Sequence, residues 1–195
     1  DIRNQFLKYH KNNKMPLAQA MSEHFNLDID YSNLKNEFYF DKLELLNYEK
    51  KFFFLKNFSL IHSTTKKTFT LNKEWKLSGL QKIIDSFQDI NWVQIGTSNE
   101  PKLKNCKHLL DINLRETAYL IYKSNFIVSY EGLFNHLAAC FDKKNFLIHT
   151  GFLHENSINY NNNIIISENK RMECYPCFDL DCKDHQTNFI SKLSE

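Results

Sequence analysis

Short apolar runs alternate with helical periods along most of the chain after residue 57. The runs have the length and composition of buried strands, and they lie at residues 58–62, 91–96, 108–112, 126–130, 145–150 and 163–167. Between most of them, apolar residues recur every three or four positions, as they do on one face of a helix. This alternation predicts an α/β domain with a Rossmann-like parallel sheet and flanking helices.

Capping residues mark the starts of two of these helices. Ser78 with Gln81, and Asn113 with Glu116, have the spacing of a capping box. The apolar residues that follow predict buried faces, which are Leu80, Ile83, Ile84 and Phe87 in the first helix and Leu114, Ala118, Ile121 and Tyr122 in the second. Two further helices are expected at about residues 131–140 and around Phe189, Ile190 and Leu193.

The first 57 residues are less regular than the rest. An amphipathic stretch at 15–25 is followed by a polar connection at 26–36 and a mixed segment at 38–57. We therefore expect two parts, with residues 1–57 outside the sheet domain of residues 58–195.

Three of the four glycines, Gly96, Gly132 and Gly151, lie at or just beyond the carboxyl ends of predicted strands. In open parallel sheets the ligand crevice lies outside these strand ends, where the backbone turns tightly and approaches the ligand. The positions therefore favour a binding site at this edge, although strand ends also need turns for purely structural reasons.

The loop His62 to Trp75 (HSTTKKTFTLNKEW) follows the first predicted strand. Its Thr64 and Thr65 hydroxyls, with Lys73 and the pair at 66–67, could clamp a pyrophosphate, a lysine neutralising negative charge on the leaving group. A solvated basic loop is the other interpretation of such a run.

The junction Ser129 to Ala139 (SYEGLFNHLAA) joins a predicted strand to a predicted helix. A helix start presents free backbone amides and the positive end of the helix dipole, which suit phosphate oxygens. His136 could add a donor, and Glu131 could accept hydrogen bonds from sugar hydroxyls. The structural alternatives are helix capping for Glu131 and a core histidine for His136.

These residues resemble glycosyltransferase family 9, the ADP-heptose-dependent lipopolysaccharide heptosyltransferases, over roughly residues 60–182. In that family a strand ending in His leads into a Thr-Thr pair and then a Lys before Trp, similar to His62, Thr64, Thr65, Lys73 and Trp75. The family's D-x-G-x-x-H-L-x-A-A junction is similar to residues 131–139, with Glu131 for Asp and Leu133 in place of the motif's Gly.

The resemblance implies the carboxyl-terminal half of a two-domain GT-B fold. Thr64, Thr65, Lys73 and His136 would hold the diphosphate, Glu131 and Gly132 would contact the sugar or phosphate, and Glu100 with the backbone near Ile112 would hold the nucleoside. Leu133 puts a Cβ where the backbone should approach the sugar, which could narrow the site or select another sugar. The acceptor site and the catalytic base would belong to the amino-terminal domain, of which residues 1–57 resemble only the tail and linker.

The composition and charge of the chain disfavour some classes of partner but do not identify one. The 25 basic and 23 acidic residues are interspersed and leave a formal net charge of +2, which does not favour nucleic acid. No apolar run approaches the roughly 20 residues that cross a bilayer. We interpret the chain, which begins at Asp1 without a leader, as an excerpt of a cytoplasmic protein that could associate with the inner membrane.

Five cysteines are spread unevenly, unlike a secreted disulfide framework. Cys174, Cys177 and Cys182, with His185, have a spacing that could hold zinc or iron, but a single C-x-x-C is a weak signal. Reduced structural thiols, with no metal, are the default interpretation.

The resemblance to glycosyltransferase family 9 thus implies a glycosyltransferase that inverts the anomeric carbon, requires no cofactor, and uses an ADP-sugar as donor and a cell-surface glycan such as lipopolysaccharide as acceptor. The alternative is a degenerate, non-catalytic binding or assembly module. A nicotinamide-dependent Rossmann enzyme is disfavoured because no G-x-G-x-x-G occurs.

Overall fold

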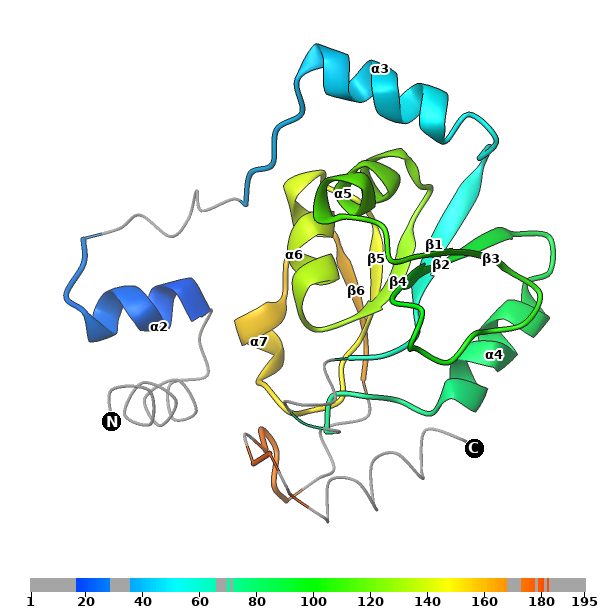
Figure 1. The fold of residues 1–195 in the computed structure, drawn as a ribbon. Helices are drawn as coiled ribbons and strands as arrows, with labels where there is room; N and C mark the ends of the chain where they lie inside the picture. Colours follow the sequence, from blue (N-terminus) through cyan, green and yellow to red (C-terminus); the bar gives the residue numbers. More distant parts are fainter. Residues whose placement is uncertain are drawn as a thin grey trace.

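The computed structural model describes residues 17–28, 36–65, 70, 72–167, 173–177, 179, 180 and 182. These residues form one six-stranded sheet with helices on both faces (Figure 1). The strands are β1 (Phe58–His62), β2 (Asn91–Gly96), β3 (Lys107–Leu110), β4 (Ile127–Tyr130), β5 (Asn145–Ile148) and β6 (Asn163–Ile166). Each lies within one residue of a predicted run at its start and within two at its end.

The strand order is β3-β2-β1-β4-β5-β6, and every neighbouring pair is parallel. The chain builds outward from β1 in one direction and then, from β4 onward, in the other. The order therefore reverses between β1 and β4, so the loops that leave these two strands diverge to opposite faces and open a crevice. The predicted Rossmann-like parallel α/β fold is confirmed.

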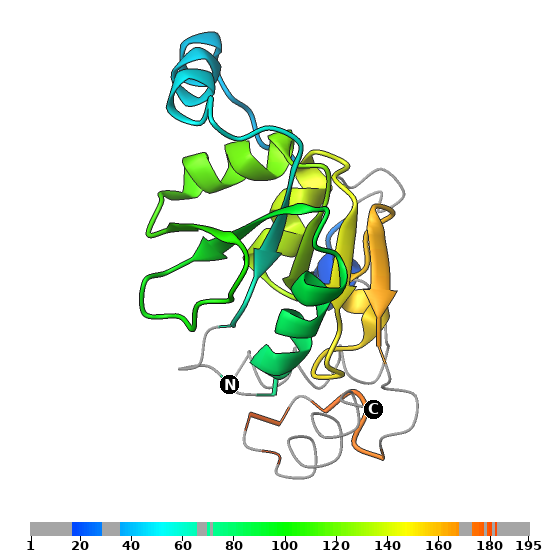
Figure 2. The same ribbon diagram turned by 90° about the vertical axis from the view of Figure 1, so that its right-hand side faces the viewer.

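Successive side chains of each central strand enter two different cores. Leu60 and Ile127 join the cluster under α5 (Leu114–Lys123) and α6 (Leu133–Cys140), whereas Ile61 and Val128 join the cluster under α4 (Leu77–Ser86). This two-sided burial explains why the strands are continuously apolar rather than alternating. In Figure 2, α5 (bright green, upper left) and α4 (blue-green, lower centre) lie well apart from each other.

Two sequence predictions about α4 need correction. The helix begins at Leu77 after Lys76, which makes no side-chain cap, so Ser78 lies inside the helix and the predicted capping box is wrong. Gln81 instead accepts a hydrogen bond from the backbone N–H of Lys104 (2.7 Å), which attaches the helix to the next loop. Leu80 and Ile84 are buried as predicted, but Phe87, just past the helix, is 53% exposed.

The capping box of α5 is confirmed, since Asn113 and Glu116 make both reciprocal hydrogen bonds. The prediction of its buried face is correct for two of four residues. Ala118 and Ile121 are buried, but Leu114 and Tyr122 are 49% and 44% exposed. The helix packs against both the sheet and α3 (Lys42–Lys51), so its buried surface is rotated to include Thr117, Tyr119 and Leu120.

The segment before β1 packs on the sheet domain. Phe40 stacks on Phe141 with ring centroids 5.7 Å apart, and the Arg115 guanidinium donates to Glu44 of α3. That guanidinium lowers the pKa of Glu44 to about 2. Residues 36–57, which the sequence analysis placed outside the sheet domain, therefore contact that domain.

The remaining described helices are short. They are α2 (Leu17–His24), within the predicted amphipathic stretch, and α7 (Glu155–Ile158), which the sequence did not indicate. The predicted helix around Phe189, Ile190 and Leu193 lies outside the described residues. In the described part of the chain, no helix has the length and apolar character that crossing a membrane requires.

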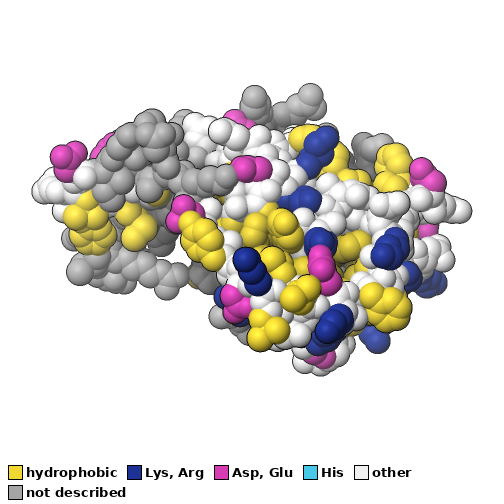
Figure 3. Space-filling view, turned by 90° about the horizontal axis from the view of Figure 1, so that it is seen from above, with side chains coloured by type: hydrophobic (Ala, Val, Ile, Leu, Met, Phe, Trp, Pro, Cys, Tyr) yellow, Lys and Arg dark blue, Asp and Glu magenta, His cyan; other side chains and the backbone are white. Residues whose placement is uncertain are grey.

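The face over α3 carries hydrophobic side chains mixed with charges of both signs (Figure 3).

Candidate functional site: a two-lobed cleft at the carboxyl ends of β1 and β4

A cleft lies where the loops after β1, β2 and β4 meet. It has a larger lobe of about 650 Å³ and a smaller lobe of about 310 Å³. Both lobes are lined by His62, Thr65, Leu133 and Phe134. The two loops that the sequence singled out thus border one crevice, at the position where the strand order reverses.

The larger lobe is lined by four of the candidate residues, Thr64, Glu100, Ile112 and the shared Thr65. Glu100 accepts hydrogen bonds from the backbone N–H of Thr97 (3.1 Å) and from its hydroxyl (3.2 Å). A Cβ at Gly96, where φ is +148°, would lie 2.3 Å from the Glu100 carboxylate. Gly96 therefore permits both the turn after β2 and the position of this carboxylate.

The smaller lobe contains Lys73, Glu131 and Gly132, together with Thr65. The Lys73 ammonium lies 3.1 Å from Oε1 of Glu131 and 5.0 Å from the centre of the Phe152 ring. The Glu131 side chain is 1% exposed, and within the described structure neither of its oxygens accepts a well-oriented hydrogen bond. A buried carboxylate with this unused capacity can accept hydrogen bonds from ligand hydroxyls.

The helix start at this lobe differs from the prediction. The α6 helix begins at Leu133 with Gly132 as its N-cap residue, so Glu131 lies before the helix and does not cap it. Gly132 has a φ of +142°, which side chains rarely permit, and a Cβ there would find open space. The glycine is thus required by the backbone conformation rather than by crowding.

His136 lies one turn inside α6 and lines neither lobe as a surface residue. Its Nδ1 is 2.7 Å from the Tyr160 hydroxyl, which also accepts a hydrogen bond from the Asn36 amide (2.9 Å). Burial, and then the charge of Lys73, lower the pKa of His136, which keeps the imidazole neutral at pH 7. Because the hydroxyl already accepts from Asn36, it can donate to Nδ1, leaving the imidazole proton on Nε2.

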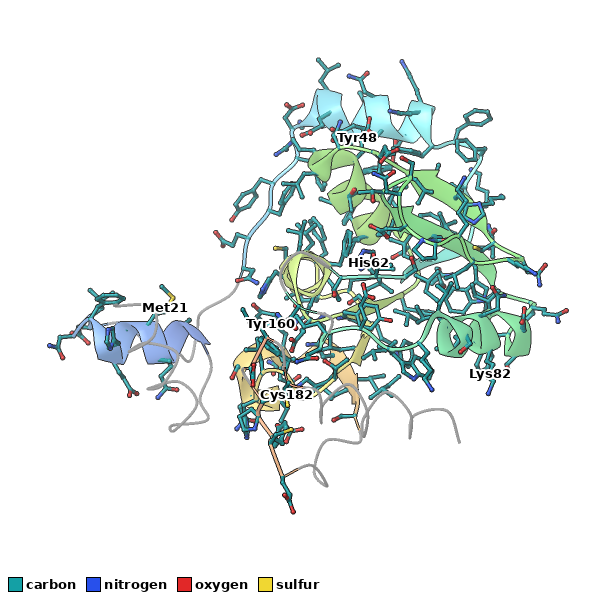
Figure 4. The ribbon with its side chains drawn as sticks, turned by 60° about the horizontal axis from the view of Figure 1, so that its bottom comes forward. Met21, Tyr48, His62, Lys82, Tyr160 and Cys182 are labelled. Atoms are coloured by element: carbon teal, nitrogen blue, oxygen red, sulfur yellow. The ribbon has the colours of Figure 1, made fainter. Side chains whose placement is uncertain are left out.

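His62 is the most perturbed base of the cleft. Burial lowers its pKa to about 3, although a Glu100 oxygen lies 3.7 Å from its Nε2. Desolvation outweighs this attraction because the imidazole packs edge-on against Phe134, with ring centroids 4.2 Å apart. Figure 4 shows His62 near the centre of the molecule.

The sequence did not identify Tyr160, Phe134 or Tyr130 as site residues. Tyr130 holds the Lys73 loop, since its hydroxyl bonds to both the N–H and the C=O of Trp75 at 3.2 Å. Tyr160 lies in an asparagine-rich turn that carries no recognisable motif. The available signal for Tyr130 was an aromatic residue at the carboxyl end of a predicted strand.

The three late cysteines also converge. The sulfur atoms of Cys174, Cys177 and Cys182 lie within 4.8 Å of one another. His185 and the lysines at 66–67 lie outside the described residues.

No protein-family model matches the sequence, and no curated protein matches it. Solved structures do match the fold. The Escherichia coli ADP-heptose lipopolysaccharide heptosyltransferase II aligns with a TM-score of 0.58 at 14% identity, over 71% of this chain and 47% of that one. A glycosyl transferase family 9 protein from Veillonella parvula aligns with a TM-score of 0.56 at 8% identity, over 78% and 49%.

The dodecameric iron-containing heptosyltransferase TibC, crystallised with ADP-D-β-D-heptose, aligns with a TM-score of 0.57 at 12% identity, over 85% of this chain and 42% of that one. The chain thus spans about half the length of these structures. At such identities the similarity establishes a shared Rossmann-like fold, of the kind found in these glycosyltransferases.

Proposed function

We propose that the cleft binds the nucleoside diphosphate of a nucleotide-sugar, and that the chain is the carboxyl-terminal, donor-binding half of a GT-B glycosyltransferase. The observation that carries this proposal is the meeting of Lys73 and the amino end of α6 at one lobe of the cleft. A lysine ammonium and free helix amides are a matched pair of diphosphate ligands.

The two lobes suit the two ends of such a donor. The larger lobe offers the apolar side chains of Ile112 and Leu114 for a base and the Glu100 carboxylate for ribose hydroxyls. The smaller lobe offers Thr65 and Lys73 for the diphosphate, and Glu131 for hydroxyls of the sugar. Thr64 borders the larger lobe, and Gly132 ends the smaller one at the helix start.

The same groups would assist the departure of the diphosphate. As the bond between sugar and phosphate breaks, negative charge grows on the leaving oxygen, and Lys73, the α6 amides and His136 Nε2–H can stabilise it. Lys73 would supply the positive charge, and the amides and the imidazole would supply hydrogen bonds, so the step needs no cofactor. The base that activates the acceptor would lie in the other half of the enzyme, across the cleft.

Two of the similar structures favour an ADP-sugar of the heptose type, since one contains ADP-D-β-D-heptose and the other is an ADP-heptose lipopolysaccharide heptosyltransferase. We accordingly propose ADP-heptose or a related ADP-sugar as donor and a cell-surface glycan such as lipopolysaccharide as acceptor. Transfer would occur in the cytoplasm, at or near the inner membrane.

Calorimetric titration with ADP tests the binding proposal. We expect ADP to bind more tightly than UDP or GDP, and the substitutions Lys73→Ala and His136→Ala each to weaken ADP binding about tenfold or more. Lys82→Ala is the matched control, because Lys82 is exposed on α4 and points away from the sheet (Figure 4). Unchanged ADP affinity in both Lys73→Ala and His136→Ala, or equal losses in the control, would contradict the assignment.

A second candidate function is a non-catalytic module that retains the fold. The observation in its favour is that Glu131 already pairs with Lys73, while the half-exposed Leu133 side chain lines both lobes. Consumption of an ADP-sugar by the full-length protein in the presence of a glycan acceptor separates the two functions. Tight ADP binding without consumption of any donor would favour the module.

A further inference from the structure

Three cysteine sulfurs converge outside the cleft, on the segment after β6. Cys177 is buried, Cys174 and Cys182 are partly buried, and the three sulfur atoms lie within 4.8 Å of one another. Zinc–sulfur bonds of about 2.3 Å place the sulfur atoms of a tetrahedral site about 3.8 Å apart. The sulfur atoms are therefore within about 1 Å of the separation that a shared ion requires.

We propose that Cys174, Cys177 and Cys182 bind one zinc or iron ion, which ties the carboxyl-terminal segment to the loop that carries Lys73. Thiolates are soft ligands that select such ions over magnesium or calcium. The three sulfurs supply three of the four ligands of a tetrahedral site.

A disulfide explains this arrangement less well. It would join two of the three sulfurs at about 2.05 Å, and it would not explain why the third sulfur lies close to them. Convergence of all three sulfurs on one point is the feature that a metal ion requires and a disulfide does not.

The backbone around the cysteines is held by partners far away in the sequence. The Cys177 N–H donates to the Gly151 carbonyl (3.0 Å). The Thr70 hydroxyl donates to the Leu180 carbonyl and the Asn72 amide to the Asp179 carbonyl, both at 2.7 Å. These bonds hold Asp179 and Leu180, which lie between the second and third cysteines, against Thr70 and Asn72, and this favours a preformed site.

The same contacts lead to the cleft. Asn72 directly precedes Lys73, is fully buried, and accepts a hydrogen bond from the Thr150 hydroxyl at 2.8 Å. An ion that holds the cysteine segment therefore also restrains the residue next to Lys73. Since none of the three cysteines lines either lobe, the ion would be structural rather than catalytic. This part of the inference rests on the proposed function.

Metal analysis tests the site itself. We expect protein purified under reducing conditions without chelators to contain about one zinc or iron ion per chain, measured by mass spectrometry of the elements. Cobalt(II) substitution should give thiolate-to-cobalt charge-transfer absorption and the intense visible bands of a tetrahedral site. The single variant Cys182→Ala, which keeps the C-x-x-C pair, should bind zinc at least tenfold more weakly than the wild type.

The double variant Cys106→Ala/Cys140→Ala is the control, because these cysteines lie elsewhere in the fold, and it should retain the ion. The proposal is overturned if wild-type protein incubated with zinc or iron(II) retains neither ion after gel filtration. It is equally overturned if the control loses the ion as readily as Cys182→Ala does, or if two of the three thiols form a disulfide in protein prepared without oxygen. Circular dichroism of Cys182→Ala separates loss of metal from loss of fold.

ADP titration before and after removal of the ion tests the link to Lys73. We expect removal with a chelator to weaken ADP binding about fivefold or more and re-addition of zinc to restore it. If the protein holds the ion but never binds ADP, the proposed function fails and the metal site stands. Equal ADP affinity with and without the ion would disprove the link.

Discussion

The Lys73 ammonium lies 3.1 Å from a carboxylate oxygen of Glu131, and the two residues come from loops that leave different strands of the sheet. Lys73 belongs to the loop after β1, and Glu131 follows β4 directly. Their side chains are 17% and 1% exposed, so this ion pair lies largely within the protein. It joins the two loops at the position proposed for the diphosphate and the sugar.

The pair makes a prediction for stability. Lys73→Met should lower the free energy of unfolding by roughly 3 kcal/mol, because it leaves the buried Glu131 carboxylate without a counter-charge. Adding Glu131→Gln should recover most of that loss, since a neutral amide needs no cation. Urea denaturation of the two single variants and the double variant measures both effects. Additive losses in the double variant would show that the two residues do not interact.

The contact between Tyr160 and His136 makes a prediction for binding. Tyr160→Phe removes the donor to Nδ1, so the imidazole can place its proton there instead of on Nε2, and ADP binding should weaken about threefold to tenfold. Tyr122→Phe, a change at a partly exposed tyrosine on α5, should leave ADP affinity unchanged. Calorimetry on both variants checks this. Equal affinities for wild type and Tyr160→Phe would rule out this role of the hydroxyl.

His62 makes a prediction for pH dependence. Its pKa in the folded protein is lowered to about 3 by burial, whereas an unfolded chain has the ordinary value of 6.5. Below pH 6.5 the unfolded chain therefore binds a proton that the native protein does not. The stability from His62 is fully present above pH 6.5 and is lost as the pH falls toward 3, by up to about 1.4 kcal/mol per pH unit.

Urea denaturation of wild type and His62→Phe at pH 7 and pH 5 isolates this effect from other titrating groups. The variant should lose less stability than the wild type between the two pH values. A loss as large as that of the wild type would assign the acid sensitivity to other residues.

Leu133 makes a prediction for donor selection. Its side chain is 53% exposed and borders both lobes, at the position where the resembled motif has glycine. Leu133→Ala should leave ADP affinity within about twofold but increase the affinity for ADP-heptose, because the smaller sugar lobe gains proportionally more space than the larger nucleoside lobe. Leu114→Ala, at the nucleoside lobe, is the control and should not favour the sugar donor. Equal effects of Leu133→Ala on ADP and ADP-heptose would exclude Leu133 from sugar selection.

The sequence by itself determined the elements and their class. Strands buried on both faces must be continuously apolar, so the runs at 58–62 and 91–96 were visible without coordinates, and the alternation with helical periods predicted a parallel sheet. The capping box of α5 was readable because it depends on two residues three positions apart. Glycines after strands indicated the edge where the cleft lies, since a positive φ is a local requirement.

Only the tertiary structure decided which side chains meet. The rotation of α5 depends on α3, the Ser78 cap gives way to the contact of Gln81 with a later loop, and Tyr160 reaches His136 from 24 residues away. The pairing of Lys73 with Glu131 and the convergence of three cysteines also depend on the tertiary structure. Spacing along a chain specifies neighbours within an element, whereas contacts between elements depend on how the sheet orders its strands.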